Sequence, residues 1–245
     1  MDRPRGGEQP ATAGDRLDRP LPGAPPRTRH RLRRDPGCPV RPGPPGQDPL
    51  HRHLDLEPSA IVEGQWIAER RGRERVVSEQ PPYSLLARGV EREVLPVAQR
   101  HGLAVIPWSP LAGGWLSGRY RRGAAQPASS RADRQAARFD IADPGNAAKL
   151  EAADALAVLA EQTGLSLVRL ALAFVLEHPA VTSVIIGPRT LEQLESQLGA
   201  GEVRLSADVL DQIDKIVPPG TTLSARDAGY TPPSLTDPAL RRRSR

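Results

Sequence analysis

Hydrophobic residues follow a regular pattern only from Pro58 onward. Beyond that residue, apolar positions recur at helical spacing in some stretches and gather into short apolar runs in others. The helical spacing predicts helices over residues 59–72, 90–101, 143–162, 167–177, 190–198 and 206–217. The short runs predict strands over residues 75–80, 103–107 and 181–186. Helices and strands alternate through short loops, which favours an α/β fold with about three parallel strands.

The ends of the predicted helices carry residues that cap helices. The N-cap candidates are Ser59, Asp143, Ser166 and Ser206. Gly102 is a C-cap candidate, because glycine adopts the left-handed conformation that a C-cap needs. Pro96 lies inside the helix predicted over residues 90–101, where we expect it to introduce a kink.

One predicted strand leads directly into a loop suited to a ligand. The run over residues 103–107 has no alternation, so we expect a strand buried on both faces. Trp108 and the glycines Gly113 and Gly114 follow at its carboxyl end, where α/β enzymes bind ligands. An indole can lie against a planar ring there, and glycines let backbone N–H groups approach phosphate oxygens. The simpler interpretation is a Trp in a surface loop.

A second candidate motif is VIIGPRTLEQLESQLGA, residues 184–200. Arg189 can pair with a phosphate in bidentate geometry. Gln193 and Gln197 are four residues apart, on one helical face, and can donate hydrogen bonds to a ribose phosphate or an adenine edge. The simpler interpretation is a capping turn followed by a solvated amphipathic helix.

The two motifs together resemble known sequences. IPWSPLAGGWLSGRY, residues 106–120, is similar to the seventh-strand loop of the aldo-keto reductases, which are NADP(H)-dependent oxidoreductases with a (β/α)8 TIM barrel. Residues 184–200 resemble the eighth-strand loop and helix that bind the adenosine end of NADP(H) in that family. The resemblance implies an α/β fold with a partial (β/α)8 TIM barrel, about its last three strands and their helices, over residues 58–230.

The resemblance also implies roles for individual residues. Gln80 is expected to contact the nicotinamide carboxamide, and Trp108 to stack on the nicotinamide ring. The residues expected around the pyrophosphate are Ser109, Leu111, Gly113 and Arg119. The residues expected to bind the adenosine phosphate are Gly187, Arg189, Gln193 and Gln197. Gln197 stands where the family usually has Asn, and Ser196 stands where an acid is common.

The family's catalytic groups find no counterpart in this chain. By the same resemblance, they are an Asp, a Tyr, a Lys and a His carried by the first four strands of the barrel. The only tyrosines and lysines here are Tyr83, Tyr120, Tyr230, Lys149 and Lys215, and no Tyr and Lys follow the family's pattern. His101 and His178 fall at predicted helix ends, where a capping role is favoured. We therefore nominate no catalytic residue and no metal ligand, and expect a chain that is inactive as written.

Residues 1–57 differ from the rest of the chain. They hold 12 Pro and 11 Arg with almost no periodic apolar positions, which is typical of a disordered segment. A second hypothesis is translation one base out of frame. In the shifted frame, residues 47–55 can encode KIRYIGTST, which resembles the fifth strand of the family. Residues 15–26 can encode TDWIDLYQVHR, which resembles the fourth strand with its active-site His.

Charge and cysteine content indicate which classes of partner and which compartment the chain suits. The formal charge of +5 comes from basic residues mixed with acids and not interleaved with aromatics, so a nucleic-acid-binding role is a third, less favoured reading. A dense basic cluster ends the segment 231–245, which we expect to be a disordered tail. The single Cys38 cannot form an internal disulfide and fits a reducing compartment. With no long apolar run and no secretory signal, we expect a cytoplasmic protein without a membrane partner.

The leading interpretation is an aldo-keto reductase-like, NADP(H)-dependent oxidoreductase whose small-molecule substrate, by family, is an aldehyde or ketone. The alternative is a non-catalytic NADP(H)-binding or interaction module. Three strands cannot close a barrel, so two sheet edges would face solvent. We therefore expect a poorly stable, aggregation-prone product.

Overall fold

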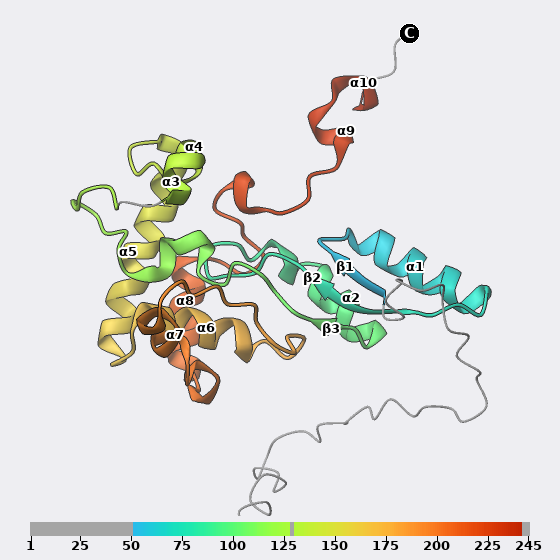
Figure 1. Cartoon of the computed structure of the whole chain (residues 1–245), viewed down its shortest axis with the longest axis horizontal. Helices are drawn as coiled ribbons and strands as arrows, with labels where there is room; N and C mark the ends of the chain where they lie inside the picture. The colour runs from blue at the N-terminus through green and yellow to red at the C-terminus, as the bar shows by residue number, and fades with distance from the viewer. Residues whose placement is uncertain (1–50, 128–129, 242–245) are drawn as a thin grey trace, which may run out of the picture. The chain divides into compact units, whose positions relative to one another are not determined.

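The computed structural model describes residues 51–127 and 130–241 of the chain. All of them belong to one compact unit, residues 43–245. The unit contains a parallel sheet with the strand order β1-β2-β3, formed by β1 (His51–Leu54), β2 (Val76–Gln80) and β3 (Ala104–Val105) (Figure 1). The predicted α/β class is therefore confirmed as a helix-rich fold around a small parallel sheet. A sheet of three strands does not form a closed barrel.

An extended segment continues the sheet beyond β3. Val181 forms a parallel bridge with Val105. The backbone N–H of Thr182 donates to the carbonyl of Val105 at 2.9 Å, and that of Ile185 donates to the carbonyl of Pro107 at 2.9 Å. Residues 181–186, predicted as a strand, thus run parallel to β3 but pair too sparsely to form a regular strand.

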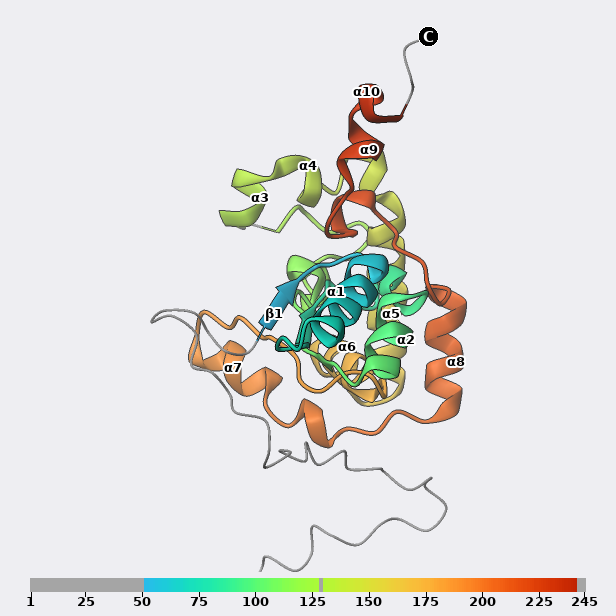
Figure 2. The ribbon, with the colours of Figure 1, turned by 90° about the vertical axis from the view of Figure 1, so that its right-hand side faces the viewer.

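Helices α1 (Pro58–Arg70) and α2 (Val94–His101) follow β1 and β2 and pack against each other, and the two views show them side by side (Figures 1 and 2). Ile61, Gln65 and Ala68 are the buried residues of α1. The side chain of Gln65 donates to the carbonyl of Val76 at 2.8 Å. The buried amide therefore ties α1 to the first residue of β2.

The larger hydrophobic layer is helical. It is formed by α5 (Ala147–Gln162), α6 (Leu167–Glu177) and α8 (Ala207–Ile216), with the shorter α7 (Leu191–Gln197) against α6. Helix α6 is apolar on most sides and buried along most of its length, as its sequence predicts. Ser166 caps α6 and Ser206 caps α8, each accepting from a backbone N–H within the first turn. These two predicted N-caps are confirmed.

Short helices occupy the connecting segments. After β3 come the 3-10 helix η2 (Ala112–Ser117), α3 (Ser130–Arg134), α4 (Ala136–Phe139) and η3 (Pro144–Asn146). The described part of the segment 121–141 therefore contains two short helices. The remaining short helices of the described chain are η1 (Gly89–Glu91), η4 (Ala200–Glu202), η5 (Ala225–Asp227), α9 (Pro233–Thr236) and α10 (Pro238–Arg241).

Several local predictions need correction. The strand predicted over residues 103–107 alternates between buried and half-buried positions, so one of its faces lacks a complete cover. The N-cap of α1 is Glu57 and not Ser59, because Pro58 occupies the first helical turn. Pro96 lies in the first turn of α2, where its missing N–H breaks no helical hydrogen bond, so it does not kink a longer helix.

The predicted limits of the two terminal segments also differ from the structure. β1 lies inside residues 1–57, for which disorder is predicted, while residues 1–50 lie outside the described part of the chain. Helices α9 and α10 occur where the predicted disordered tail over residues 231–245 begins. No single helix of the described residues is long and apolar enough to cross a membrane. Residues 144–162 and 167–177 pass that test only as a pair bent by 94°.

Candidate functional site

The predicted cofactor segments lie side by side at one edge of the sheet. The backbone N–H of Trp108 donates to Pro81 at 3.1 Å, and that of Tyr83 donates to Trp108 at 3.4 Å. Residues 181–186 run along the other side of the segment that contains β3 and Trp108. The backbone N–H of Ile185 donates to the carbonyl of Pro107 there. Since all three segments are parallel, their carboxyl ends share one rim of the sheet. The structure thus brings Gln80, at the end of β2, and Trp108 to the same rim, from which residues 187–189 also continue.

Trp108 is half-buried, and its indole Nε1 is buried. Within the described part of the chain, Nε1 has no hydrogen-bond acceptor. A buried donor left unpaired costs about 1–3 kcal/mol. Trp108 is therefore not packed as an ordinary core residue, and a bound acceptor would stabilise it.

The loop after Trp108 has an unusual backbone. Gly113 and Gly114 have φ values of 70° and 116°, in the region that favours glycine. Ser109 and Ala112 also have positive φ values, 57° and 49°, which cost roughly 1–2 kcal/mol each for residues with a β-carbon. Such strain persists where the surroundings impose it, and it is concentrated at binding sites. Two of the three non-glycine residues with a positive φ in the described backbone therefore lie in the predicted pyrophosphate segment.

This strained loop is anchored by buried aromatics. Trp115 and Leu116 are fully buried, and the ring of Trp115 stacks on Tyr120 with a centroid distance of 4.3 Å. Arg119 is exposed, and its Nε donates to the hydroxyl of Ser117 at 3.3 Å. A β-carbon built on Gly114 would lie 3.8 Å from the Arg119 guanidinium, so this cation lies over the glycine turn. The half-buried Leu111 packs against the core beneath the turn.

The residues predicted for the adenosine phosphate divide into two groups. Gln193 accepts a hydrogen bond from the backbone N–H of Arg189 at 2.8 Å, so its side chain helps to cap α7. Thr190 completes the cap by accepting from the backbone N–H of Gln193 at 3.2 Å. Gln197 is half-buried, and its Oε1 is buried without a hydrogen-bond donor among the described residues. The capping interpretation therefore holds for Gln193, whereas Gln197 has an open acceptor.

Gly187 is not required by the backbone. Its φ is not positive, and a β-carbon added to it would meet no atom within 4 Å. The chain therefore leaves residues 181–186 without a backbone conformation that requires glycine at position 187. A glycine at this exposed position leaves room for another molecule to approach the backbone.

Two carboxyl groups near the rim are not among the residues that the sequence predicts for this site. Glu79 is fully buried between β1 and β3, and its Oε1 accepts from the backbone N–H of Leu56 at 3.0 Å. Its Oε2 has no partner among the described residues, and burial raises the pKa of Glu79 to about 7. Burial also raises the pKa of Asp55. A charged residue inside a short strand, directly before Gln80, was the signal that could have identified Glu79.

A cavity of about 300 Å³ lies at the ends of β1 and β2. Asp55, Pro82, Thr222 and Tyr230 are among its lining residues. Pro82 also forms a backbone bridge with Trp108, so this cavity adjoins the predicted nicotinamide position. It is lined by both polar and apolar groups.

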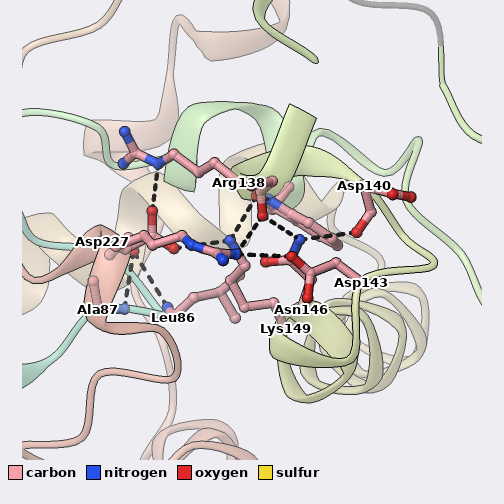
Figure 3. A network of polar contacts seen from close by, with 12 residues as sticks. Leu86, Ala87, Arg138, Asp140, Asp143, Asn146, Lys149 and Asp227 are labelled. Atoms are coloured by element: carbon pink, nitrogen blue, oxygen red, sulfur yellow. Dashed lines mark hydrogen bonds and ion pairs between the residues drawn. The ribbon is translucent and has the colours of Figure 1, made fainter. Parts of the chain in front are cut away.

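A buried polar network fixes one wall of this region (Figure 3). The ammonium of Lys149 lies 3.0 Å from Asp227 Oδ2 and donates to the carbonyl of Arg138 at 3.0 Å. The guanidinium of Arg138 bonds the other oxygen of Asp227 at 2.6 Å. The ammonium also lies 4.7 Å from the centre of the Trp115 ring, and burial lowers the pKa of Lys149. The network joins α4, α5 and η5, and its role is to hold these elements together.

Two of the described tyrosines, Tyr83 and Tyr120, are buried. Tyr83 is buried and donates to Glu91 at 2.7 Å, and burial raises its pKa. Burial likewise raises the pKa of Tyr120. A tyrosine that protonates an alkoxide near neutral pH needs a lowered pKa. Among the described residues, no group of three or more His, Cys, Asp or Glu side chains is arranged to hold a metal ion.

Comparison with known proteins identifies the family. The model of the Aldo/keto reductase family matches residues 59–218. The chain belongs to this family, as the Trp108 loop and the residues around Arg189 predict. It is 39% identical over 158 residues to the uncharacterized oxidoreductase YrpG of Bacillus subtilis, a match that covers 64% of this chain and 45% of that protein.

Two further relatives carry other names. A probable voltage-gated potassium channel subunit beta of Arabidopsis thaliana is 34% identical over 167 residues, which cover 64% of this chain and 48% of the relative. The protein tas of Escherichia coli is 34% identical over 150 residues, which cover 61% of this chain and 42% of the relative. The chain thus spans less than half the length of each of these relatives. Family membership supports an oxidoreductase-like function.

Proposed function

We propose that this chain binds NADP(H) along the carboxyl rim of its sheet. The nicotinamide end lies at Gln80 and Trp108, and the adenosine phosphate lies at Arg189 and Gln197. The proposal rests on the backbone pairing of three neighbouring segments: β2, the segment from β3 to Trp108, and residues 181–186. This pairing brings the predicted contacts for both ends of the cofactor to one rim. Family membership supports the same cofactor, since aldo/keto reductases generally use NADP(H).

The unpaired polar atoms fit a dinucleotide. Trp108 Nε1 is a buried donor and Gln197 Oε1 a buried acceptor, each without a partner in the described chain. A dinucleotide offers amide, hydroxyl and phosphate groups that complete both. The glycine turn over residues 113–114 and the cation of Arg119 suit a pyrophosphate. When bound, NADPH supplies the hydride for reduction of a carbonyl group.

We further propose that the sheet corresponds to four successive strands of a (β/α)8 barrel, with residues 181–186 as the last. A small aldehyde or ketone would enter the cavity beside Pro82, next to the proposed nicotinamide position. The raised pKa of Tyr83 and of Tyr120 argues against either as the proton donor. The second candidate, a non-catalytic NADP(H)-binding module, is favoured by this observation.

The frame hypothesis for the start of the chain also gains physical support. Ser78 and Glu79 lie opposite residues 52 and 53 of β1, and Ser78 Oγ and Glu79 Oε2 are both buried without partners in the described chain. Native interiors satisfy nearly all such atoms. We propose that the sequence of β2 is suited to pair with a different strand in place of β1, and that the shifted reading frame encodes this strand. Nucleotide sequencing tests this, and codons that do not spell KIRYIGTST in that frame would exclude it.

The experiment for cofactor binding is calorimetric titration of the chain with NADPH and with NADH. We expect Arg189→Ala to lower the affinity for NADPH by about 10- to 100-fold and to leave the affinity for NADH unchanged. The reason is that hydrogen bonds to charged groups contribute about 1.5–3 kcal/mol. Arg204→Ala is the matched control, because Arg204 is exposed and its guanidinium donates to the backbone carbonyls of Gly201 and Val203. An equal loss of affinity for NADPH and NADH would contradict the role assigned to Arg189. Oxidation of NADPH in the presence of an aldehyde would refute the non-catalytic candidate.

A further inference from the structure

One buried ammonium contacts both the predicted pyrophosphate segment and a wall of the cavity. Lys149 is fully buried in α5. Its ammonium lies 4.7 Å from the centre of the Trp115 ring, and Trp115 directly follows the glycine turn over residues 113–114. The same ammonium lies 3.0 Å from Oδ2 of Asp227, which lines the cavity together with Tyr230. A single side chain therefore connects two segments that the proposed function assigns to different ligands.

On the side of the glycine turn, the ammonium and Trp115 share an acceptor. The indole Nε1 of Trp115 donates to the carbonyl of Arg138 at 3.4 Å, and the Lys149 ammonium donates to the same oxygen at 3.0 Å. The backbone N–H of Gly114, directly before Trp115, donates to the carbonyl of Leu111 at 2.8 Å. Because Trp115 and Lys149 are both fully buried, water does not weaken the attraction between the cation and the ring. The position of the glycine turn therefore depends on the position of the ammonium.

On the side of the cavity, the wall over residues 225–230 is held at two points. The first is the carboxylate of Asp227, whose Oδ1 accepts from Arg138 at 2.6 Å while its Oδ2 faces the ammonium (Figure 3). The backbone N–H of Asp227 donates to the carbonyl of Ser224 at 2.9 Å, which closes η5. The second point is the backbone N–H of Tyr230, which donates to the carboxylate of Asp55. The base of this wall therefore depends on the same ammonium as the glycine turn.

We propose that Lys149 is a positioning residue that sets the glycine turn and the cavity wall relative to each other, so that a ligand bound at one orders the other. The inference rests on the proposed function for its two ligands, NADP(H) at the turn and a small carbonyl compound in the cavity. An ammonium suits this position, because its donors reach a carboxylate and a carbonyl while its charge faces a ring. A ligand that restricts the motion of one segment then lowers the entropic cost of ordering the other.

Hydrogen exchange in the chain without cofactor gives the first test. Trp115→Leu removes the ring from the ammonium, and we expect amides 225–230 to exchange about tenfold faster or more, the effect of losing a desolvated cation–π contact. In a Lys149→Met background the same substitution should give no further increase, because the connecting group is already absent. Phe174→Leu is the matched control, since Phe174 is a buried ring of α6 with the guanidinium of Arg88 5.0 Å from its centre.

The exchange rates are compared with those of α1, which corrects for changes in global stability. No change over residues 225–230 in Trp115→Leu, an equal increase in Phe174→Leu, or an equal increase in the Lys149→Met background overturns the proposal. Asp227→Asn gives the reciprocal measurement, and it keeps the shape of the side chain while removing its charge. Exchange over residues 112–117 should become faster in this variant, and unchanged exchange there also counts against the proposal.

Calorimetry and hydrogen exchange with NADPH test the connection to binding. In the wild type we expect NADPH to slow exchange over residues 225–230, although none of its predicted contacts lies there. Lys149→Met should still bind NADPH, because Lys149 is not among those contacts, but exchange over residues 225–230 should no longer respond. Binding without slower exchange in the wild type, or an equal response in Lys149→Met, overturns this inference and leaves the proposed function intact. Absence of NADPH binding refutes the proposed function, and exchange in the free chain then decides this inference alone.

Discussion

The side-chain oxygen of Gln193 accepts a hydrogen bond from the backbone N–H of Arg189 at 2.8 Å. Gln193 is therefore part of the cap of α7, although its spacing of four residues from Gln197 predicts a contact with the cofactor. The two interpretations of this glutamine can be separated by experiment, because a cap affects stability and a ligand contact affects affinity.

We expect Gln193→Ala to lower the free energy of unfolding by about 1 kcal/mol, the usual effect of losing a cap. NADPH affinity should change little. Gln193→Glu keeps a suitable cap acceptor, so it should preserve stability while its negative charge weakens NADPH binding. Urea denaturation and calorimetry measure the two quantities. A large loss of NADPH affinity in Gln193→Ala with unchanged stability would contradict the capping role.

The buried ion pair of Lys149 and Asp227 gives a second prediction. Lys149 is fully buried, so Lys149→Met leaves Asp227 with Arg138 as its remaining ionic partner. Because Arg138 still compensates the charge of Asp227, we expect the loss of one hydrogen bond between charged groups, about 1.5–3 kcal/mol. Lys215→Met, at an exposed position of α8, should change stability by less than about 0.5 kcal/mol. Equal effects of the two substitutions in denaturation experiments would show that the network is not structural.

Glu79 predicts a dependence of stability on pH. Its pKa is raised from 4.5 to about 7 in the folded chain, so between these values the folded state binds more protons than the unfolded state. Stability is then highest below about pH 4.5 with respect to this group, and it falls as the pH rises towards 7. Glu79→Gln should remove this component of the pH profile. An unchanged profile in the variant would assign the dependence to another group.

Two glycines of the proposed site should respond differently to substitution. Gly113 has a φ of 70°, so Gly113→Ala should destabilise the chain by about 1 kcal/mol or more. Gly187→Ala should leave stability unchanged, because its φ is ordinary and no atom lies within 4 Å of the added β-carbon. If a ligand approaches the backbone at Gly187, the same substitution weakens NADPH binding. Thermal unfolding with and without NADPH measures both effects.

Features set by nearby residues could be predicted from the sequence. Gly102, with a φ of 66°, ends α2, and Ser166 and Ser206 begin α6 and α8, because a cap depends only on adjacent backbone groups. The spacing of Thr190 and Gln193 also matches a capping box, and this local signal was outweighed by the resemblance to a cofactor-binding helix.

Features set by distant residues could not be predicted in this way. Lys149 is buried because it meets Asp227, 78 residues further along the chain. Residues 103–107 alternate between buried and half-buried positions because one side of the sheet lacks a complete cover, which the residue pattern within this run does not reveal. The orphan atoms of Trp108 and Gln197 likewise follow from tertiary packing. Residue types identified the candidate site, and the folded chain determines which of their atoms are available.

The most direct test of the account is the affinity for NADPH of three chains: the wild type, Trp108→Ala and Trp66→Ala. Trp66 is exposed on α1 and serves as the control. The account predicts that Trp108→Ala weakens binding by about tenfold or more, since loss of aromatic stacking and of an unpaired donor's partner together exceeds roughly 1.4 kcal/mol. Trp66→Ala should bind like the wild type. Equal affinity of all three chains, or no binding by the wild type, would contradict it.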